Sequence, residues 1–208
     1  MSAQIISRSA KTSAEPQSVK PDHAGYATNT SYRRNAGVGA MFLSFFGTLW
    51  IIFGAHAAGA GLPLLIITAI AGLILFGFAW RRSRESGPQL SQDSAAPDFL
   101  TDLEANNKKV FRRVNAAQYL AITALIVALN VIGKPEWSVD GIILIVGAHF
   151  FPLARLFKSP THYVTGAALI LIAILVPVLS TPASPVAPVA TGLVLWASAL
   201  YGQLRKPF

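Results

Sequence analysis

The chain has 208 residues, of which 53% are hydrophobic and only 12% are charged. A soluble domain carries roughly 25% charged residues, so this composition argues against a soluble globular protein. The chain contains no cysteine, which excludes disulfides, thiolate metal sites and thiol nucleophiles.

The N-terminal segment, residues 1–34, is rich in Ser, Ala, Thr and Pro and has no apolar central run. It therefore does not resemble a signal peptide, and its low hydrophobicity predicts a disordered cytoplasmic tail. The remainder, residues 35–208, is predicted to form one all-α membrane domain with a cytoplasmic loop at 81–113.

Three long stretches, 35–80, 114–133 and 159–204, contain no Lys, Arg, Asp or Glu. A membrane helix needs about 20 apolar residues, so the first and third stretches are each long enough for two crossings. Clusters of Pro and Gly interrupt both stretches and indicate turns. Six transmembrane helices are predicted, at residues 35–55, 62–80, 114–133, 138–157, 161–180 and 189–203.

The fourth predicted helix is short, because only 14 uncharged residues separate Asp140 from Arg155. A re-entrant segment is the alternative to a crossing. With six crossings and a cytoplasmic N-terminus, 16 of the 17 Lys and Arg residues lie inside, and only Lys134 lies outside. Without the fourth crossing the division becomes 12 to 5, so the positive-inside rule favours six helices with both termini cytoplasmic.

The second part of the long loop, residues 98–113, is predicted to be helical, since Thr101 and Glu104 have capping-box spacing. Its apolar and basic residues indicate either an amphipathic segment that binds anionic lipid or an ordinary cytoplasmic extension. The cations of the chain flank the helices instead of forming one binding face, so nucleic acid is not an expected partner.

His149 and Pro152 lie inside the fourth predicted helix, where a polar side chain needs a partner. Pro152 should also kink the helix, because it cannot donate a backbone hydrogen bond. His149 is either a proton carrier or ligand contact, or a structural residue bonded to a neighbouring helix. The candidate polar cluster consists of His149, Pro152, Arg155, Asn115, Gln118 and Tyr119.

Enzyme motifs and cofactor sites are not evident in the sequence. Asp140 falls on the helix face opposite His149, which argues against an intrahelical relay, and no predicted helix interior carries a carboxylate. Haem ligation by His149 and His56 would need the two residues at similar depths, and His56 is predicted at the outer boundary. We expect a non-enzymatic protein without a metal or other cofactor.

Small residues on the first two predicted helices suit close helix packing, and the Trp residues are expected at the membrane interfaces. The small residues are Gly37, Gly39, Ala40, Gly47, Gly72 and Gly77, and the Trp residues include Trp196. The two halves of the chain each hold three crossings, which allows an inverted repeat; Gly54-Ala55-His56 and Gly147-Ala148-His149 hint at one. Three helical hairpins are the alternative.

The segment from Val146 to Phe157 contains the motif Gly-x-His-Phe-x-Pro-Leu-Ala-Arg, and Pro160, Tyr163, Thr165 and Gly166 follow it. This region, about 20 residues long, resembles a family of small uncharacterised bacterial multi-pass membrane proteins. The resemblance implies a bacterial membrane protein and assigns no role to any residue.

These observations together predict a non-enzymatic six-helix protein of the bacterial cytoplasmic (inner) membrane with an unknown molecular role. Its expected partner is the lipid bilayer, with anionic lipid at the basic cytoplasmic flanks. The sequence also allows a homo-oligomer. Two more specific functions are alternatives: a small solute or proton-linked transporter that uses the fourth helix, and a structural or partner-binding membrane subunit.

Overall fold

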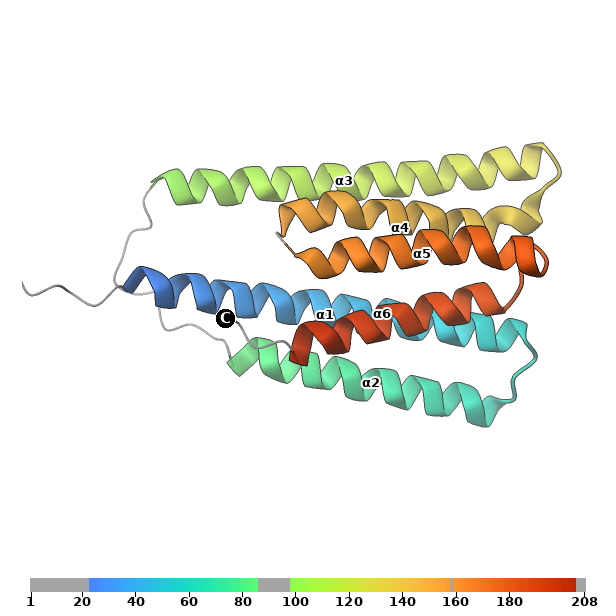
Figure 1. Ribbon diagram of the computed structural model, residues 1–208, viewed down its shortest axis with the longest axis horizontal. Coiled ribbons are helices and arrows are strands. Elements are labelled where there is room, and N and C mark those ends of the chain that lie inside the picture. Colours follow the sequence, from blue (N-terminus) through green and yellow to red (C-terminus); the bar gives the residue numbers. More distant parts are fainter. Residues whose placement is uncertain (1–22, 86–97, 158, 205–208) are drawn as a thin grey trace, which may run out of the picture.

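In the part of the chain that the structure describes, six long helices run side by side (Figure 1). The computed structural model describes residues 23–85, 98–157 and 159–204, and within these the side chains of 39–84, 107–157 and 159–204. A short 3-10 helix, η1, precedes α4. The elements are α1 (His23–Ala57), α2 (Leu62–Glu85), α3 (Asp98–Val131), η1 (Pro135–Trp137), α4 (Ser138–Leu156), α5 (Pro160–Leu179) and α6 (Val186–Leu204).

All six helices are long and apolar enough to cross a membrane, so the predicted multi-pass, all-helical architecture is confirmed. The fourth span is one of them, with an apolar window at Pro135–Leu156. It is one continuous helix that lies between α3 and α5 (Figure 1), which rules out a re-entrant loop within this segment.

Some helix ends differ from the predicted ones. α1 begins at His23, inside the segment expected to be a disordered tail, and residues 1–22 lie outside the described part. α3 joins the expected helix at 98–113 to the third span without a break. The side chains of Thr101 and Glu104, the expected capping box, are outside the described side chains. α6 begins at Val186, because a proline in the first turn of a helix, here Pro188, loses no intrahelical hydrogen bond.

The helices form two groups of three, one of which joins helices from opposite ends of the chain. α1 packs against α2 and α6, whereas α4 packs against α3 and α5, and the contact between α5 and α6 joins the groups. Figure 1 shows α1, α2 and α6 on one side of the bundle and α3, α4 and α5 on the other. In each half of the chain, the third helix therefore packs on the first helix of the other half.

This packing of each third helix on the other half of the chain leaves open whether the two halves are an inverted repeat. His56 is exposed in the last turn of α1, whereas His149 is half-buried and seven residues before the end of α4. The two Gly-Ala-His sequences therefore do not occupy equivalent places.

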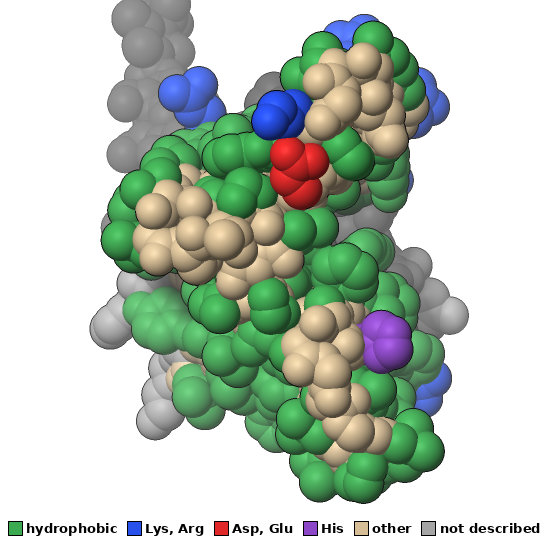
Figure 2. Space-filling view, turned by 90° about the vertical axis from the view of Figure 1, so that its right-hand side faces the viewer, with side chains coloured by type: hydrophobic (Ala, Val, Ile, Leu, Met, Phe, Trp, Pro, Cys, Tyr) green, Lys and Arg blue, Asp and Glu red, His purple; other side chains and the backbone are tan. Residues whose placement is uncertain are grey.

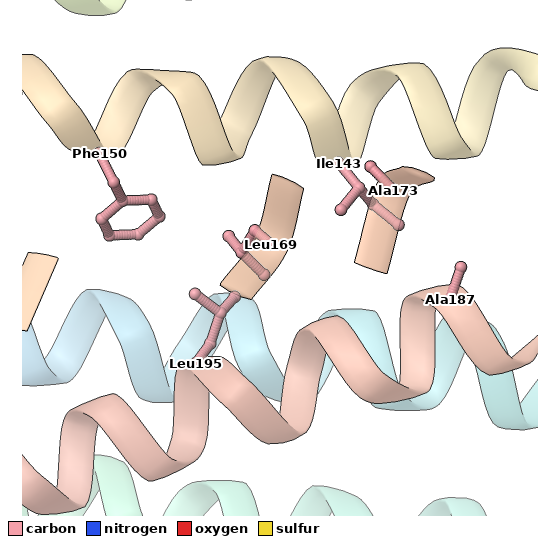
Figure 3. Packing of buried hydrophobic residues seen from close by; sticks show 6 residues of the cluster. All are labelled: Ile143, Phe150, Leu169, Ala173, Ala187 and Leu195. Atoms are coloured by element: carbon pink, nitrogen blue, oxygen red, sulfur yellow. The ribbon is translucent and has the colours of Figure 1, made fainter. Parts of the chain in front are cut away.

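The hydrophobic core lies where the two groups meet. Figure 3 shows its buried side chains, which come from α4, α5 and α6. They are Ile143, Phe150, Leu169, Ala173, Ala187 and Leu195. Leu43 and Trp50 of α1 pack against this cluster from the other group, so α1, α4, α5 and α6 share one core.

Glycines bring the helices of each group into close contact. A Cβ on Gly192 of α6 would overlap the backbone oxygen of Gly47 on α1, and a Cβ on Gly166 of α5 would lie 2.7 Å from the oxygen of Gly147 on α4. Between α2 and α1, a Cβ on Gly72 would overlap the side chain of Thr48. The expected packing role of Gly47 and Gly72 is confirmed, whereas Gly39 and Gly77 face open space.

Asp140 is a buried carboxylate in the first turn of α4, and its burial was not predicted. It is only 3% exposed, and its Oδ2 accepts a hydrogen bond from the Ala183 amide at 3.2 Å, across the turn between α5 and α6. Ser184 donates to the Thr181 oxygen and closes this turn, with Pro182 and Ala183 as its central residues. Ala183 has φ of 61°, a left-handed conformation that an L-residue adopts at a cost of about 1–2 kcal/mol.

We predict that Ala183→Gly raises the free energy of unfolding by about 1 kcal/mol, because glycine adopts the left-handed conformation without a steric penalty. Equilibrium unfolding in mixed detergent micelles measures the change. Ala58→Gly is the control, since Ala58 lies in the α1–α2 turn and does not have a positive φ. A loss of stability in Ala183→Gly as large as in the control would contradict the prediction.

Candidate functional site

The candidate residues lie along the contact between α3 and α4, which we call the α3–α4 seam. The helices are antiparallel: a Cβ on Gly141 would touch Leu125, and the Phe111 and Phe157 rings lie 6.1 Å apart. His149 is midway in sequence between Gly141 and Phe157, and Gln118 is midway between Leu125 and Phe111. His149 and Gln118 therefore lie at the same level on the two helices, and Asn115 lies level with Pro152.

The candidate residues differ in their exposure. His149, Gln118 and Asn115 are half-buried, as expected for side chains at the contact between two helices. Tyr119 is 68% exposed, and Pro152 and Arg155 are also exposed. None of the residues in the apolar window of α3, Asn107–Val131, is buried. The seam is thus at the edge of the bundle and not in its core.

Helix periodicity sorts the seam into two flanks. On α3, Lys108, Arg112, Asn115 and Tyr119 follow one another at spacings of four, three and four, so they share a face. In an antiparallel pair, the side of one helix reached by turning toward higher residue numbers meets the side of the other helix reached in the same way. His149 is therefore on the side of α4 that meets these residues of α3. We call this side of the seam the polar flank.

The opposite side, which we call the small-residue flank, carries Arg113, Ala117 and Ala121 on α3 and Ala148 and Arg155 on α4. Helix periodicity therefore places Asn115, Gln118, Tyr119 and His149 toward one side of the seam and Arg155 on the other.

No hydrogen bond or ion pair connects these side chains within the described part of the chain. The polar cluster around His149 therefore stays a prediction. Pro152 lies inside α4, where it leaves the Ala148 carbonyl without its usual intrahelical donor.

An aromatic cluster at the α4–α5 corner was not predicted. His162 packs edge-on against Phe150 and Phe157, with ring centroids 5.7 and 6.0 Å apart, and Phe157 contacts Phe111 of α3. The sequence signal was the short link between the two helices, because Pro160 starts α5 just after α4 ends and brings His162 next to Phe157.

The buried polar groups elsewhere hold helices together. Thr165 and Ser198 share a hydrogen bond of 2.7 Å between α5 and α6. Trp196, which was expected at a membrane interface, is half-buried, and its Nε1 donates to the Ser44 oxygen and Thr48 Oγ1 of α1. These contacts join helix to helix and do not form a path through the bundle.

Three buried polar atoms have no hydrogen-bond partner among the described residues: Asp140 Oδ1, Thr191 Oγ1 and Gln203 Nε2. They are dispersed along the bundle, since Asp140 contacts the turn before α6 whereas Gln203 is next to the end of α6. Within the described residues, no group of three or more His, Asp or Glu side chains could hold a metal ion. These atoms therefore do not form a common metal site.

The cations of the described side chains gather at one end of the bundle, where α2 and α4 end and where the apolar window of α3 begins. They are Arg81, Arg82, Arg84, Lys108, Lys109, Arg112, Arg113 and Arg155. Lys134 is at the opposite end, beside Glu136. Figure 2 shows this opposite end, which is mostly hydrophobic. We call the first end the basic end.

Residues 111–203 match the family model described as "Family of unknown function (DUF7010)". The match begins within α3 and extends almost to the end of α6, so it includes the α3–α4 seam and leaves out α1 and α2. No curated protein and no solved structure matches the chain. The chain is therefore similar to an uncharacterised family over its last four helices.

Proposed function

We propose that the protein is a non-enzymatic, multi-pass protein of the bacterial cytoplasmic membrane, with both termini on the cytoplasmic side. The distribution of cations supports this orientation, because Lys and Arg accumulate on the cytoplasmic side of membrane proteins. Eight of the nine described Lys and Arg side chains are at the basic end. The bacterial assignment rests on the resemblance of the His149 segment, and anionic lipid is the proposed partner of the basic end.

Within this class, a structural or partner-binding subunit is the function that the geometry supports best. The observation that carries this proposal is the position of the seam. Asn115, Gln118 and His149 lie at the edge of the bundle, where α3 contacts only α4 and η1 among the described elements. A solute pathway would instead place polar groups between the two groups of helices. That region contains the hydrophobic core, and Thr165 and Ser198 between α5 and α6 bond to each other there.

A transporter is the second candidate, and the arrangement of the helices favours it. The two groups of three helices have matching connections, in which α1 and α4 each pack between two neighbours. Inverted repeats of three helices are common in transporters.

Cysteine labelling tests the orientation. We predict that Thr181→Cys, in the exposed α5–α6 turn, reacts with a membrane-impermeant maleimide in intact cells. Asn107→Cys, exposed at the basic end, should react only after the cells are opened. The reverse pattern of labelling would contradict the proposed orientation.

Proton flux separates the subunit from the transporter. We predict that proteoliposomes containing the wild-type protein acidify no faster than empty liposomes when a proton gradient is applied. His149→Gln and His149→Leu should both fold, with unfolding free energies within about 1 kcal/mol of the wild type, because no hydrogen bond of His149 is lost in the described part. Proton uptake by the wild type that His149→Gln abolishes would favour the transporter instead.

A further inference from the structure

The polar flank of the α3–α4 seam has three chemical layers. Nearest the basic end are the cations Lys108 and Arg112, which are exposed. About 5–10 Å further along α3, at 1.5 Å per residue, come Asn115 and Tyr119, with Gln118 and His149 level with them. Ile122, Ile126 and Ile142 follow toward the opposite end of the bundle. The flank therefore changes from cationic to hydrogen-bonding to apolar with depth.

The polar side chains of this flank have no partners in the described part of the chain. Lys108 and Arg112 form no ion pair there, and Asn115, Gln118, Tyr119 and His149 form no hydrogen bond there. A polar group that meets hydrocarbon without a partner costs about 1–3 kcal/mol on mutational estimates. A ligand that satisfies several of these groups at once would remove that cost.

A phospholipid has the same three layers in the same order. Its phosphate accepts bonds from guanidinium and ammonium groups. Its ester carbonyls can only accept hydrogen bonds, and Asn, Gln, Tyr and His side chains all carry donors. Its acyl chains are apolar, as are the Ile residues. We propose that the polar flank of the seam binds one anionic phospholipid molecule, with its phosphate at Lys108 and Arg112 and its ester groups near Asn115, Gln118 and His149.

The small-residue flank is an internal comparison. It carries the cations Arg113 and Arg155 at the same end of the bundle, but the residues beneath them are Ala117, Ala121 and Ala148. These side chains have no hydrogen-bond donors. A general attraction between basic residues and an anionic surface would act on both flanks, whereas a site for a whole lipid molecule needs the donors of the polar flank.

This inference rests on the proposed anionic-lipid partner and gives that partner a site. It is tested on purified protein, so its failure would leave the labelling test of the orientation untouched.

Native mass spectrometry of the full-length protein, released from micelles doped with phosphatidylglycerol or phosphatidylcholine, counts the lipids that each chain retains. We expect one phosphatidylglycerol per chain, held more tightly than phosphatidylcholine. Arg112→Ala should weaken its retention about fivefold, the effect of one cation at a lipid surface. The matched control Arg113→Ala should leave retention unchanged.

A second pair of variants tests the hydrogen-bonding layer. Gln118→Leu combined with Asn115→Leu should weaken the retention of both lipids, because both lipids carry ester carbonyls. Ala117→Leu on the small-residue flank should leave the retention of both lipids unchanged. Circular dichroism and size-exclusion chromatography test whether each variant is folded. If the double Leu variant is not folded, Gln118→Ala replaces it.

Three results would overturn the inference. Equal retention of the two lipids by the wild type would exclude an anionic-lipid site. Equal losses in Arg112→Ala and Arg113→Ala would identify a general surface attraction. Displacement of the retained lipid by millimolar inorganic phosphate would show that the flank binds a free anion instead of a phospholipid.

Discussion

Close approach of helix backbones at glycines is the contact on which the rest of this structure depends. Lipid chains are as apolar as leucine, so burial of apolar surface does not drive helices together inside a membrane, and tight packing must do so. Gly192 meets the backbone of Gly47 between α6 and α1, and Gly166 meets the backbone of Gly147 between α5 and α4. These pairs create the two groups of helices and bring the core residues of α4, α5 and α6 into contact.

The same packing determines where polar chemistry can occur. In the core, polar side chains form hydrogen bonds to neighbouring helices, and these bonds stabilise the bundle. The side chains are Thr165, Ser198 and Trp196. Among the described residues, the tight contact of α3 is that of Leu125 with Gly141, and α3 meets the other described helices along the seam. The polar side chains of α3 therefore remain accessible at the edge of the molecule. A ligand that lies in the membrane can reach them without opening the core.

The number of helices and most of their positions could be predicted from the sequence, because hydropathy and charge report membrane crossings directly. The packing roles of Gly47 and Gly72 could also be predicted, since small residues on a membrane helix indicate close neighbours. Their partners could not, because the contact between α1 and α6 joins segments from opposite ends of the chain. Gly77 has the same local sequence character but faces open space, so composition alone does not identify a contact.

The candidate polar cluster stays a prediction. His149 stood out because it is a polar residue in an apolar helix, and the antiparallel register then places Gln118 at its level. Arg155 belonged to the candidate cluster, whereas helix periodicity places it on the other flank. Asp140 lies in the first turn of α4, and its burial could not be read from the sequence. Its burial depends on the α5–α6 turn, which starts some forty residues later and folds back over α4.

The central claim is that glycine contacts, and not general hydrophobicity, hold the helices together. Equilibrium unfolding of Gly192→Val and Gly77→Val in mixed detergent micelles tests it most directly, since both variants add the same side chain to an apolar helix. Overpacking at Gly192 should lower the free energy of unfolding by about 2–3 kcal/mol, whereas Gly77→Val should change it by less than about 1 kcal/mol. Equal stability of the two variants would contradict the account.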